Sequence, residues 1–530
     1  YRSTNGGNNF TNISTSSGTT GGLHADQHAL FFAPSLATQL WSGNDGGVWR
    51  TDDPSPTSPN WVNRNGNLAL LQFQSVAVPP ADPNVAYGGT QDNGTIKYTG
   101  SIVWNHIQNG DGGQTAVDFV TPATVYHTFF NVSFERSDNS GTSWASKTSG
   151  ITTSDRSEFY VPVEMDPTNS AVLYLGTFRL YRTPSKGDTW SSISPDLSIV
   201  PGDPNNLGDI TAIGVGKNNA SVIYTGSSNA QVYVTSNLGG AWTDVKAAPL
   251  PTRTVGTIAV SPVDANIAFV GYSGFDDPNN GNGHVFKTVN RGASWTDTTS
   301  NLPNMPVNQL VIDPAMPQMI YAATDIGPYA STNGGQTWFR YAGGLPNVAT
   351  FEIAVQQPNL LFTATHGRGM FQAFGCTGSG TTDLDADGVA DACDNCAGGS
   401  NPGQADADHD GFGAPCDCAD ADAAIHPGSP PPSDVAEDVT LAQTGDLTWS
   451  GATLAQGYDV YRGGVGPTSH FAYNQTCLAN TVPSTTVSDA TSPALGNAFY
   501  YVVASRNCMT ESGLGSQSNG TPRPNSSPCP

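Results

Sequence analysis

Charged residues are scarce in this sequence, and basic residues are the scarcer kind. The 530 residues include 20 Lys and Arg against 44 Asp and Glu, which gives a formal net charge of −24. Nucleic acids and anionic membranes both bind through basic surfaces, so this balance argues against either as a partner. No apolar run approaches the ~18 residues of a membrane-spanning helix, so membrane insertion is not expected. The excess of carboxylates instead favours divalent cations or a basic partner.

Cysteine is absent from the first 375 residues, and all eight cysteines lie in the remainder. An even number confined to a C-terminal segment is typical of disulfides formed in an oxidising compartment. Metal-bound thiolates in a reduced cytosolic chain are the alternative. The chain begins with Tyr1 and carries no signal peptide, so a mature product or a fragment is expected. We predict an extracellular protein, either secreted or displayed on a cell surface.

Glycine and proline, in contrast, are abundant, at 60 and 38 residues. Both disfavour helices and favour turns, so the composition predicts an all-β protein with many short strands. The chain exceeds the size at which one hydrophobic core stops growing, and several domains are therefore expected. The sequence divides into four segments, 1–375, 376–427, 428–433 and 434–530.

A short turn motif recurs through the first segment. In most copies a Ser or Thr is followed at alternate positions by Asn or Asp and then by Gly, with an aromatic residue close behind, as in Thr288-Val-Asn-Arg-Gly-Ala-Ser-Trp295. The polar side chains can bond the backbone of a tight turn, and the Gly accepts a positive φ. Steps of 40 to 53 residues separate the aromatic positions, which are Phe10, Trp61, Trp104, Trp144, Trp190, Trp242, Trp295 and Trp338.

Short alternating strands precede each turn, and four strands in about 45 residues are typical of a β-propeller blade. The repeated turn resembles the Asp-box of propeller proteins such as sialidases, sortilin-type receptors and xyloglucanases. The resemblance implies one large propeller over residues 1–375. We predict eight blades, the eighth combining inner strands from 349–374 with an outer turn from 1–14. Seven blades are the alternative, and so is a propeller that continues upstream of Tyr1.

The strand order of a blade brings several polar residues to one end of the ring. Turns between second and third strands, and connections between blades, open on the end opposite the Asp-box turns. Alternation along the segment that starts at His24 puts His24, Asp26 and His28 on one side of a strand. We expect this end to hold Asp26, Asp45, Asp92 and Asp111 as candidate catalytic carboxylates, and His24, His28, Asp325, His366 and Arg368 as candidate substrate-binding residues. Asp-Gly and Asn-Gly are also common hairpin turns, so a structural role for Asp45, Asp92 and Asp111 is the alternative.

Glycoside hydrolysis is one chemistry that such carboxylates support. It needs two carboxyl groups, ~5 Å apart for retention of configuration or ~6.5–9.5 Å apart for inversion. The stretch from His24 to Gly94 is similar to secreted bacterial Asp-box proteins regarded as glycosyl hydrolases, which implies a site without identifying its substrate. A sialidase is not expected, because no Arg-Ile-Pro element lies near the start of the propeller. Xyloglucanases place two propellers around a long cleft, whereas one propeller is predicted here.

An acidic segment, residues 383–422, contains eleven Asp and no Lys or Arg. Two stretches within it place Asp at loop positions 1, 3, 5 and 12 with Gly at position 6, which is the spacing of a calcium-binding loop. The expected ligands, with a backbone carbonyl at position 7, are Asp383, Asp385, Asp387, Val389 and Asp394 in the first loop and Asp406, Asp408, Asp410, Phe412 and Asp417 in the second. These carboxylates would repel one another without cations, so Ca²⁺ is the predicted cofactor.

The same segment carries a recognisable cysteine and asparagine pattern. The run from Cys393-Asp-Asn-Cys396 through Asn401-Pro-Gly-Gln404 to Cys416-Asp417 resembles a thrombospondin type 3 repeat. The resemblance implies a disulfide between Cys396 and Cys416 and calcium on the Asp residues. Ala397 stands where that family usually has Pro, a departure that removes no ligand.

A proline-rich linker at 428–433 leads into the last segment. From Asp434 onward the order of Trp, Tyr and Val strands resembles a fibronectin type III β-sandwich. That family usually lacks disulfides, whereas three cysteines occur here. A bond between Cys477 and Cys508 is one candidate, and the connectivity stays open.

Two classes of function are compatible with these features. In the first, a secreted or surface-displayed, calcium-rigidified protein binds a polysaccharide or a surface protein at the propeller mouth, or assembles with copies of itself. In the second, an extracellular polysaccharide hydrolase uses a pair of Asp side chains there. A close carboxylate pair in a deep, aromatic-lined cleft would favour the enzyme, and a flat or plugged mouth would favour binding.

Overall fold

The computed structural model divides the chain into two compact units, Tyr1–Thr381 and Thr382–Pro530, which are described separately. It describes all residues except 16–21, 67, 278–281, 342–344, 357–359, 375–383, 386, 388, 390, 392–393, 402–411, 415, 423–424, 426–438, 443, 468–470, 508–509, 515, 518–520, 526 and 530. The regular secondary structure of the described residues is β throughout. They contain no helix of the length and apolar character that crossing a membrane requires.

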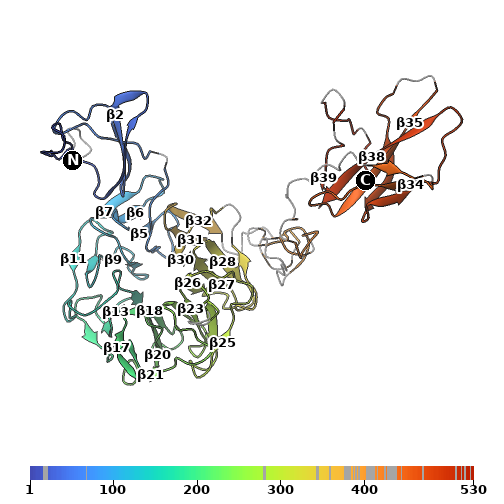
Figure 1. The fold of residues 1–530 in the computed structure, drawn as a ribbon. Helices are drawn as coiled ribbons and strands as arrows, with labels where there is room; N and C mark the ends of the chain where they lie inside the picture. Colours follow the sequence, from blue (N-terminus) through green and yellow to red (C-terminus); the bar gives the residue numbers. More distant parts are fainter. Residues whose placement is uncertain are drawn as a thin grey trace. The chain divides into compact units, whose positions relative to one another are not determined.

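In the first unit, seven antiparallel sheets built from the described residues form the ring of a β-propeller (Figure 1). Their strands are β5 (Ala86–Thr90), β6 (Gly94–Tyr98) and β7 (Asn105–Gln108); β8 (Thr115–Val117), β9 (Val125–Thr128), β10 (Phe134–Ser137) and β11 (Ala145–Ser146); β12 (Val163–Met165), β13 (Leu173–Gly176), β14 (Leu180–Thr183) and β15 (Ser191–Ser192); β18 (Ile210–Val215), β19 (Ile223–Ser227), β20 (Val232–Thr235) and β21 (Thr243–Asp244); β22 (Val255–Val260), β23 (Ala268–Tyr272), β24 (Val285–Thr288) and β25 (Thr296–Asp297); β26 (Val307–Ile312), β27 (Ile320–Thr324), β28 (Gly327–Ser331) and β29 (Phe339–Arg340); and β30 (Thr350–Gln356), β31 (Leu360–Thr365) and β32 (Met370–Phe374). A small pair, β16 (Ile199–Val200) and β17 (Asp203–Leu207), lies between β15 and β18.

The innermost segments of the seven sheets surround a central cavity of about 520 Å³. Strands β12, β18, β22, β26 and β30 contribute to its wall, together with Gln74 and Gln114 from the segments that precede β5 and β8. The chain therefore reaches the ring centre once in each of the seven ring sheets.

The ring closes between its first and last sheets. Gln72 bridges to His366, and the backbone amide of Phe73 donates to the carbonyl of Thr365 at 3.1 Å. Phe73 and Phe362 lie in one buried cluster that joins these two sheets. Because β30–β32 already packs against this neighbour, the ring has no place for an additional blade.

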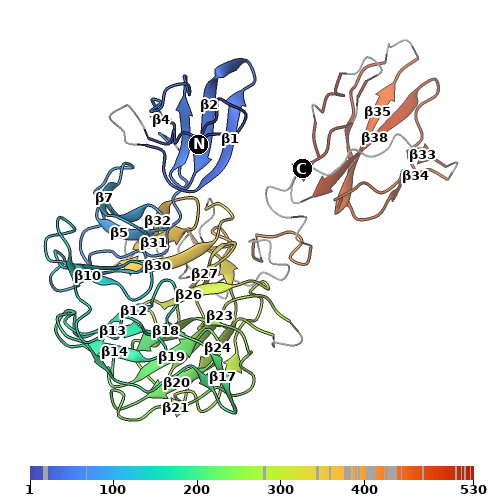
Figure 2. The ribbon, with the colours of Figure 1, turned by 60° about the vertical axis from the view of Figure 1, so that its left-hand side comes forward.

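The eighth blade, expected to combine residues 349–374 with 1–14, is not observed among the described residues, where β30–β32 forms a three-stranded sheet without a strand from 1–14. Residues 1–14 contact the sheet of β1 (Gln27–Ala33), β2 (Leu36–Asn44), β3 (Gly47–Thr51) and β4 (Val62–Asn63) instead. The Trp61 indole donates to the carbonyl of Ile13 at 2.7 Å, and Ile13 is buried with Leu40 and Trp49. This sheet lies beside the ring (Figure 2), so the repeat that starts near His24 does not contribute a sheet to the ring.

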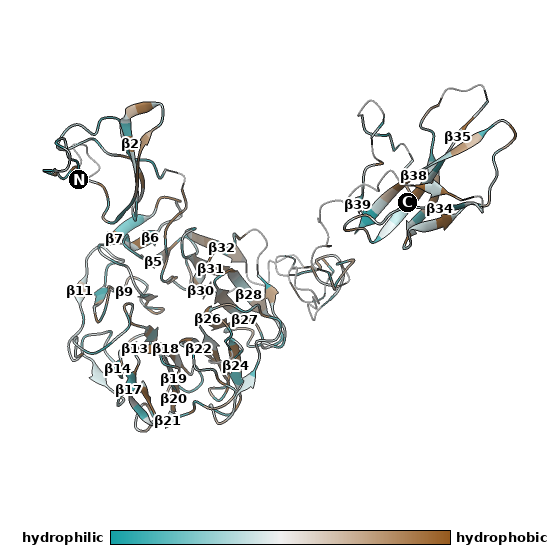
Figure 3. Cartoon of the chain, in the orientation of Figure 1, coloured by the Kyte–Doolittle hydropathy of each residue, from teal (hydrophilic) through white to brown (hydrophobic). Residues whose placement is uncertain are grey.

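The β1–β2 hairpin of this first sheet exposes an unusual amount of apolar surface. Leu30, Phe31 and Phe32 are each more than half exposed, and Leu36 is 48% exposed. Figure 3 shows the hydrophobic colouring at the hairpin tip.

The repeated turns lie between the third and fourth strands of a sheet, and their tryptophans form hydrogen bonds to the preceding repeat. In one of them, Thr288 Oγ1 accepts the amide of Gly292 at 2.8 Å, and Gly292 has a φ of +80°. The Trp295 indole then donates to the carbonyl of Val245 in the preceding blade at 3.0 Å. The same indole-to-carbonyl bond is made by Trp61, Trp144, Trp190, Trp242 and Trp338. The turn motif thus stabilises each repeat and locks it to its predecessor.

In the second unit, two antiparallel sheets share one core. One sheet contains β33 (Thr440–Leu441), β34 (Asp446–Thr448) and β37 (Thr486–Ser488), and the other contains β36 (Thr476–Val482), β35 (Gly457–Val465), β38 (Ala498–Asn507) and β39 (Thr510–Glu511). Leu447 and Trp449 from the first sheet pack against Tyr458, Val460 and Val503 from the second.

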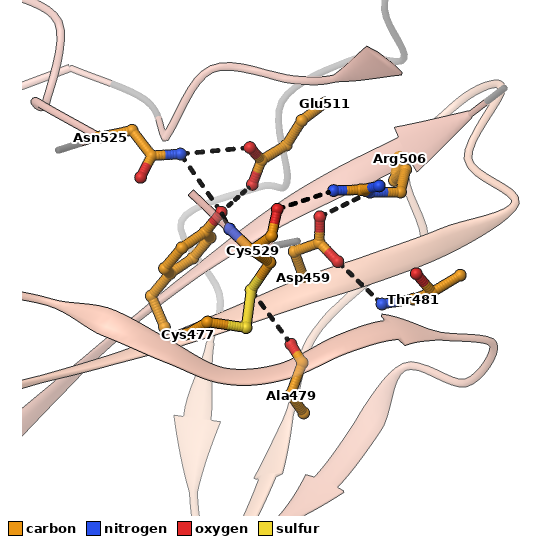
Figure 4. The surroundings of a disulfide bond; sticks show 9 residues. Asp459, Cys477, Ala479, Thr481, Arg506, Glu511, Asn525 and Cys529 are labelled. Atoms are coloured by element: carbon orange, nitrogen blue, oxygen red, sulfur yellow. Dashed lines mark hydrogen bonds and ion pairs between the residues drawn. A yellow bond between two sulfur atoms is a disulfide. The ribbon is translucent and has the colours of Figure 1, made fainter. Parts of the chain in front are cut away.

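A disulfide joins Cys477 to Cys529, so the Cys477–Cys508 bond considered from the sequence is wrong. Cys477 lies on β36 directly opposite Tyr461 of β35. The backbone amide of Cys529 donates to the Tyr461 hydroxyl at 2.9 Å, which brings the C-terminal segment onto this sheet (Figure 4). Tertiary folding of a distant segment therefore selects the partner of Cys477, and residue spacing does not.

Candidate functional site

Three of the four candidate catalytic carboxylates converge. Asp45 lies in the β2–β3 turn, Asp92 in the β5–β6 turn, and Asp26 directly before β1. One carboxylate oxygen of each lies within 4.8 Å of the others. Asp26 and Asp92 adopt positive φ values of 54° and 60°, a conformation that Asp tolerates better than most residues. We refer to Asp26, Asp45 and Asp92 as the carboxylate cluster.

Asp111, the fourth candidate, supports the cluster from the connection between β7 and β8. Its Oδ1 accepts the backbone amide of Asp92 at 3.2 Å. Partial burial, together with the nearby charges of Asp45 and Asp111, raises the pKa of Asp92 to about 6. Three carboxylates at this spacing favour either a shared proton or a bound cation, because like charges so close cannot all stay uncompensated.

The two candidate histidines contact the cluster in different ways. His28 Nε2 lies 2.5 Å from Asp45 Oδ1, with the His28 side chain 68% exposed. His24 Nε2 instead lies 2.8 Å from the backbone carbonyl of Asp92. The expected alternation of His24, Asp26 and His28 along one strand is not observed, because β1 begins at Gln27 and the left-handed Asp26 interrupts the extended chain.

The cluster opens onto a pocket of about 490 Å³ between the first sheet and the ring. His28, Asp45 and Asp92 line its polar side. Leu68, Leu70, Leu71 and the backbone around Gly367 line the rest. Asn93 Nδ2 donates to the carbonyl of Asp45 at 2.9 Å, which joins the two sides of the pocket.

Two of the remaining candidates, Asp325 and His366, contact residues that line the central cavity. Asp325 accepts a hydrogen bond from Asn308 Nδ2 at 3.0 Å, and His366 stacks on Phe351 with ring centroids 4.5 Å apart. Asn308 and Phe351 line the central cavity. Burial lowers the pKa of His366, and the Asp325 charge opposes that shift. Arg368 is exposed. Asp325 and His366 thus lie near the central cavity, whereas Arg368 directly follows Gly367, which lines the pocket beside the carboxylate cluster.

Two carboxyl groups beside the central cavity were not among the residues predicted from the sequence. Glu164 and Glu352 both face the central cavity, and Glu352 Oε2 accepts the amide of Val76 at 2.9 Å. Enclosure by the ring raises the pKa of each to about 8, although the Glu164 side chain is exposed to the cavity. Their only sequence signal is a charged residue at the centre of an innermost strand.

The acidic segment brings three of its predicted ligands together. The carboxylates of Asp385, Asp387 and Asp394 lie within 4.8 Å of one another. Asp387 Oδ2 also accepts the amide of Asn401 at 2.7 Å, and the Cys396–Cys416 disulfide is present. Hard carboxylate oxygens at loop positions 3, 5 and 12 match the donor set that calcium prefers.

The other ligands expected in this segment are only partly observable. Asp383, Asp406, Asp408 and Asp410 lie outside the described residues. Val389 is buried with 4% of its surface exposed, and its amide donates to Asp387 Oδ1 at 2.9 Å. Asp417 Oδ1 accepts the amide of Ala419 at 2.9 Å, and Phe412 directly follows residues 402–411, which lie outside the described residues.

No protein-family model matches the chain, and no curated protein matches it. Among solved structures it is similar to YCF48 from Cyanidioschyzon merolae, with 13% identity, a TM-score of 0.43, and coverage of 58% of this chain and 96% of that one. YCF48 bound to D1 peptide gives 12% identity, a TM-score of 0.42, and coverage of 58% and 95%. An ancestral GH74 enzyme gives 16% identity and a TM-score of 0.34, covering 67% of this chain and 63% of the enzyme. The description of the ring as a propeller rests on its own seven sheets and not on these likenesses.

Proposed function

We propose that the chain is an extracellular, calcium-stabilised propeller protein that binds a glycan or a protein at the end of the ring bearing the carboxylate cluster. The convergence of Asp385, Asp387 and Asp394 carries the proposal, because these side chains occupy calcium-loop positions. The disulfides Cys396–Cys416 and Cys477–Cys529 support an oxidising compartment. Within this proposal the repeats are Asp-boxes, and thrombospondin type 3 and fibronectin type III modules follow them.

Calcium binding is the first test. Isothermal titration of the chelator-treated chain with Ca²⁺ should give heat of binding that falls in Asp387→Asn and Asp394→Asn. Asp53→Asn, which changes a carboxylate of the first sheet outside both clusters, is the matched control and should bind like the wild type. Equal binding by all of these variants would contradict the calcium assignment.

Partner binding is tested separately on the calcium-loaded protein. A glycan panel and sedimentation velocity at several concentrations distinguish binding of polysaccharide from self-association. The extended apolar hairpin around Phe31 supports the second of these modes. A protein that neither binds a glycan nor assembles would leave a surface protein as its partner.

Glycoside hydrolysis is the second candidate, and one observation favours it. The pKa of Asp92 is about 6, and the charge of the neighbouring Asp45 contributes to that increase. Asp92 can therefore act as the acid while Asp45 acts as the ionised partner. Their separation, within 4.8 Å, is near the spacing used for retention of configuration. Reducing-sugar release from plant, algal and bacterial polysaccharides that disappears in Asp45→Ala, Asp92→Ala would establish the enzyme. No release from any polymer would reject it.

A further inference from the structure

Four aromatic residues form a continuous strip on the same end of the ring as the carboxylate cluster. Phe129 and Phe130 have ring centroids 4.2 Å apart, and Phe159 and Tyr160 have centroids 4.9 Å apart. Phe130 and Phe159 connect these pairs at 5.8 Å with their planes only 22° apart. Phe159 is 50% exposed and Phe130 is 39% exposed. We call Phe129, Phe130, Phe159 and Tyr160 the aromatic strip.

Backbone contacts hold the strip in shape. Its residues come from the β9–β10 turn and from the connection before β12, two loops of neighbouring blades. The amide of Asn131 donates to the carbonyl of Phe159 at 2.7 Å, and Asn131 forms a parallel bridge with Tyr160. Exposed rings fixed in this way lose little conformational entropy when a ligand covers them.

The strip adjoins the loop that carries Asp111. Glycines at 110 and 113 leave room for it: a Cβ on Gly110 would lie 2.1 Å from Phe129, and one on Gly113 would lie 2.8 Å from Tyr160. Burial raises the pKa of Tyr160, and the charges of Asp111 and Asp92 raise it too. The apolar rings and the acidic pocket therefore form adjoining parts of one surface.

We propose that the aromatic strip is a stacking site for a neutral polysaccharide whose chain extends toward the carboxylate cluster. Aromatic faces pack against the C–H faces of sugar rings, and an exposed strip of this kind marks an interaction site. Ionised carboxylates only accept hydrogen bonds, and a polyol offers hydroxyl donors in abundance, whereas a peptide backbone offers one N–H per residue. The inference rests on the proposed binding function and names its ligand class.

Charge decides between neutral and acidic polymers. The cluster and Asp111 supply negative charge beside the strip. Arg156, from the loop that leads to Phe159, is already bound to Asp209 Oδ1 at 2.9 Å and to Ser198 at 2.8 Å. A uronate polymer would thus meet repulsion beside the strip and find no new ion pair with Arg156, whereas a neutral glucan or mannan would meet no such repulsion.

The test measures the affinity of the calcium-loaded full chain for β-glucan, galactomannan and polygalacturonate by affinity electrophoresis and titration calorimetry. Phe130→Ala, Phe159→Ala should weaken binding of the neutral polymers about tenfold or more, since each ring buries apolar area on contact. Phe130→Leu, Phe159→Leu keeps apolar bulk and removes the rings, so it should weaken binding as well. Phe10→Ala, at a site 64% exposed in the first turn, is the matched control and should bind normally.

Each result separates the inference from the proposed function. Binding by the wild type that survives both double variants would overturn the strip and leave the binding function intact. Preference for polygalacturonate would overturn the neutral ligand class. Wild-type protein that binds no polymer but captures a protein partner would overturn the polysaccharide assignment, and absence of any partner would reject the proposed function itself.

Discussion

The raised pKa of Asp92 makes the stability of the first unit depend on pH in a defined direction. Asp92→Asn removes the ionisable group, and Asn accepts the positive φ at this position as readily as Asp does. In the wild type the folded carboxyl retains its proton to about pH 6, whereas the unfolded chain releases it near 3.8. The folded state thus binds more protons within this window, so the free energy of unfolding falls as pH rises from 3.8 to about 6.

The size of the effect follows from the shift. A displacement of about two pKa units at ~1.36 kcal/mol per unit gives an upper value of about 3 kcal/mol. The side chain is partly exposed, and solvent screening reduces the cost to about 1–2 kcal/mol. Asp92→Asn should accordingly be about 1–2 kcal/mol more stable than the wild type at pH 8 and close to it at pH 4. Asp45→Asn removes one of the charges that raise the pKa of Asp92. In an Asp45→Asn background, the stability gained from Asp92→Asn at pH 8 should therefore be smaller.

Urea unfolding followed by tryptophan fluorescence measures this, because every tryptophan except Trp449 lies in the first unit. A chelator keeps divalent cations from compensating the carboxylates. If the wild type and Asp92→Asn were equally stable at pH 8, or differed by the same amount at pH 4 and pH 8, the raised pKa of Asp92 would be refuted as the cause. With calcium added, a wild type more stable than Asp92→Asn would identify the cluster as a cation site.

Three further perturbations probe the ring and the second unit. Gly292→Ala should lower thermal stability by about 1–3 kcal/mol, since its Cβ would lie 2.8 Å from Val245 at a φ of +80°; Gly6→Ala, with a similar φ of +68° and open space around it, should cost less. Glu164→Gln should raise stability at pH 9 by about 1–2 kcal/mol, because the raised pKa of about 8 makes the folded wild type lose stability as pH rises toward that value; an unchanged alkaline unfolding midpoint would contradict this. Cys477→Ser should destabilise the second unit by about 2–4 kcal/mol in denaturant titration, and a reducing agent should remove the difference from the wild type.

The repeats could be predicted because their physics is local. A turn such as Thr288–Trp295 satisfies its backbone groups with its own side chains, and that requirement leaves a readable sequence motif. Blade number is not local in this sense. It depends on whether Phe362 of the last sheet finds Phe73 across the ring or a strand from the N-terminus, and the motif carries no information about that choice.

The candidate site was predictable in location but not in detail. Strand order alone assigned Asp45, Asp92 and Asp111 to one end of the ring, and the structure brings them into contact there. Their distances, and the inclusion of Asp26 through a left-handed backbone, depend on how the first sheet meets the ring. The sequence shows two aromatic pairs, Phe129-Phe130 and Phe159-Tyr160. It does not show whether such aromatic side chains are exposed or buried in the core.

The two ends of the ring differ for a reason that bears on function. At the end with the repeated turns, the indoles of five ring tryptophans each donate to a carbonyl of the previous repeat, so a change there breaks a link between blades. At the opposite end, the turns between second and third strands do not make these bonds. The carboxylate cluster and the aromatic strip both lie at that opposite end. Stability is thus concentrated in one set of turns, which leaves the other set able to vary in sequence. Binding or catalysis is therefore expected at the acidic, aromatic end, where a substitution such as Phe159→Ala changes recognition without loosening the ring.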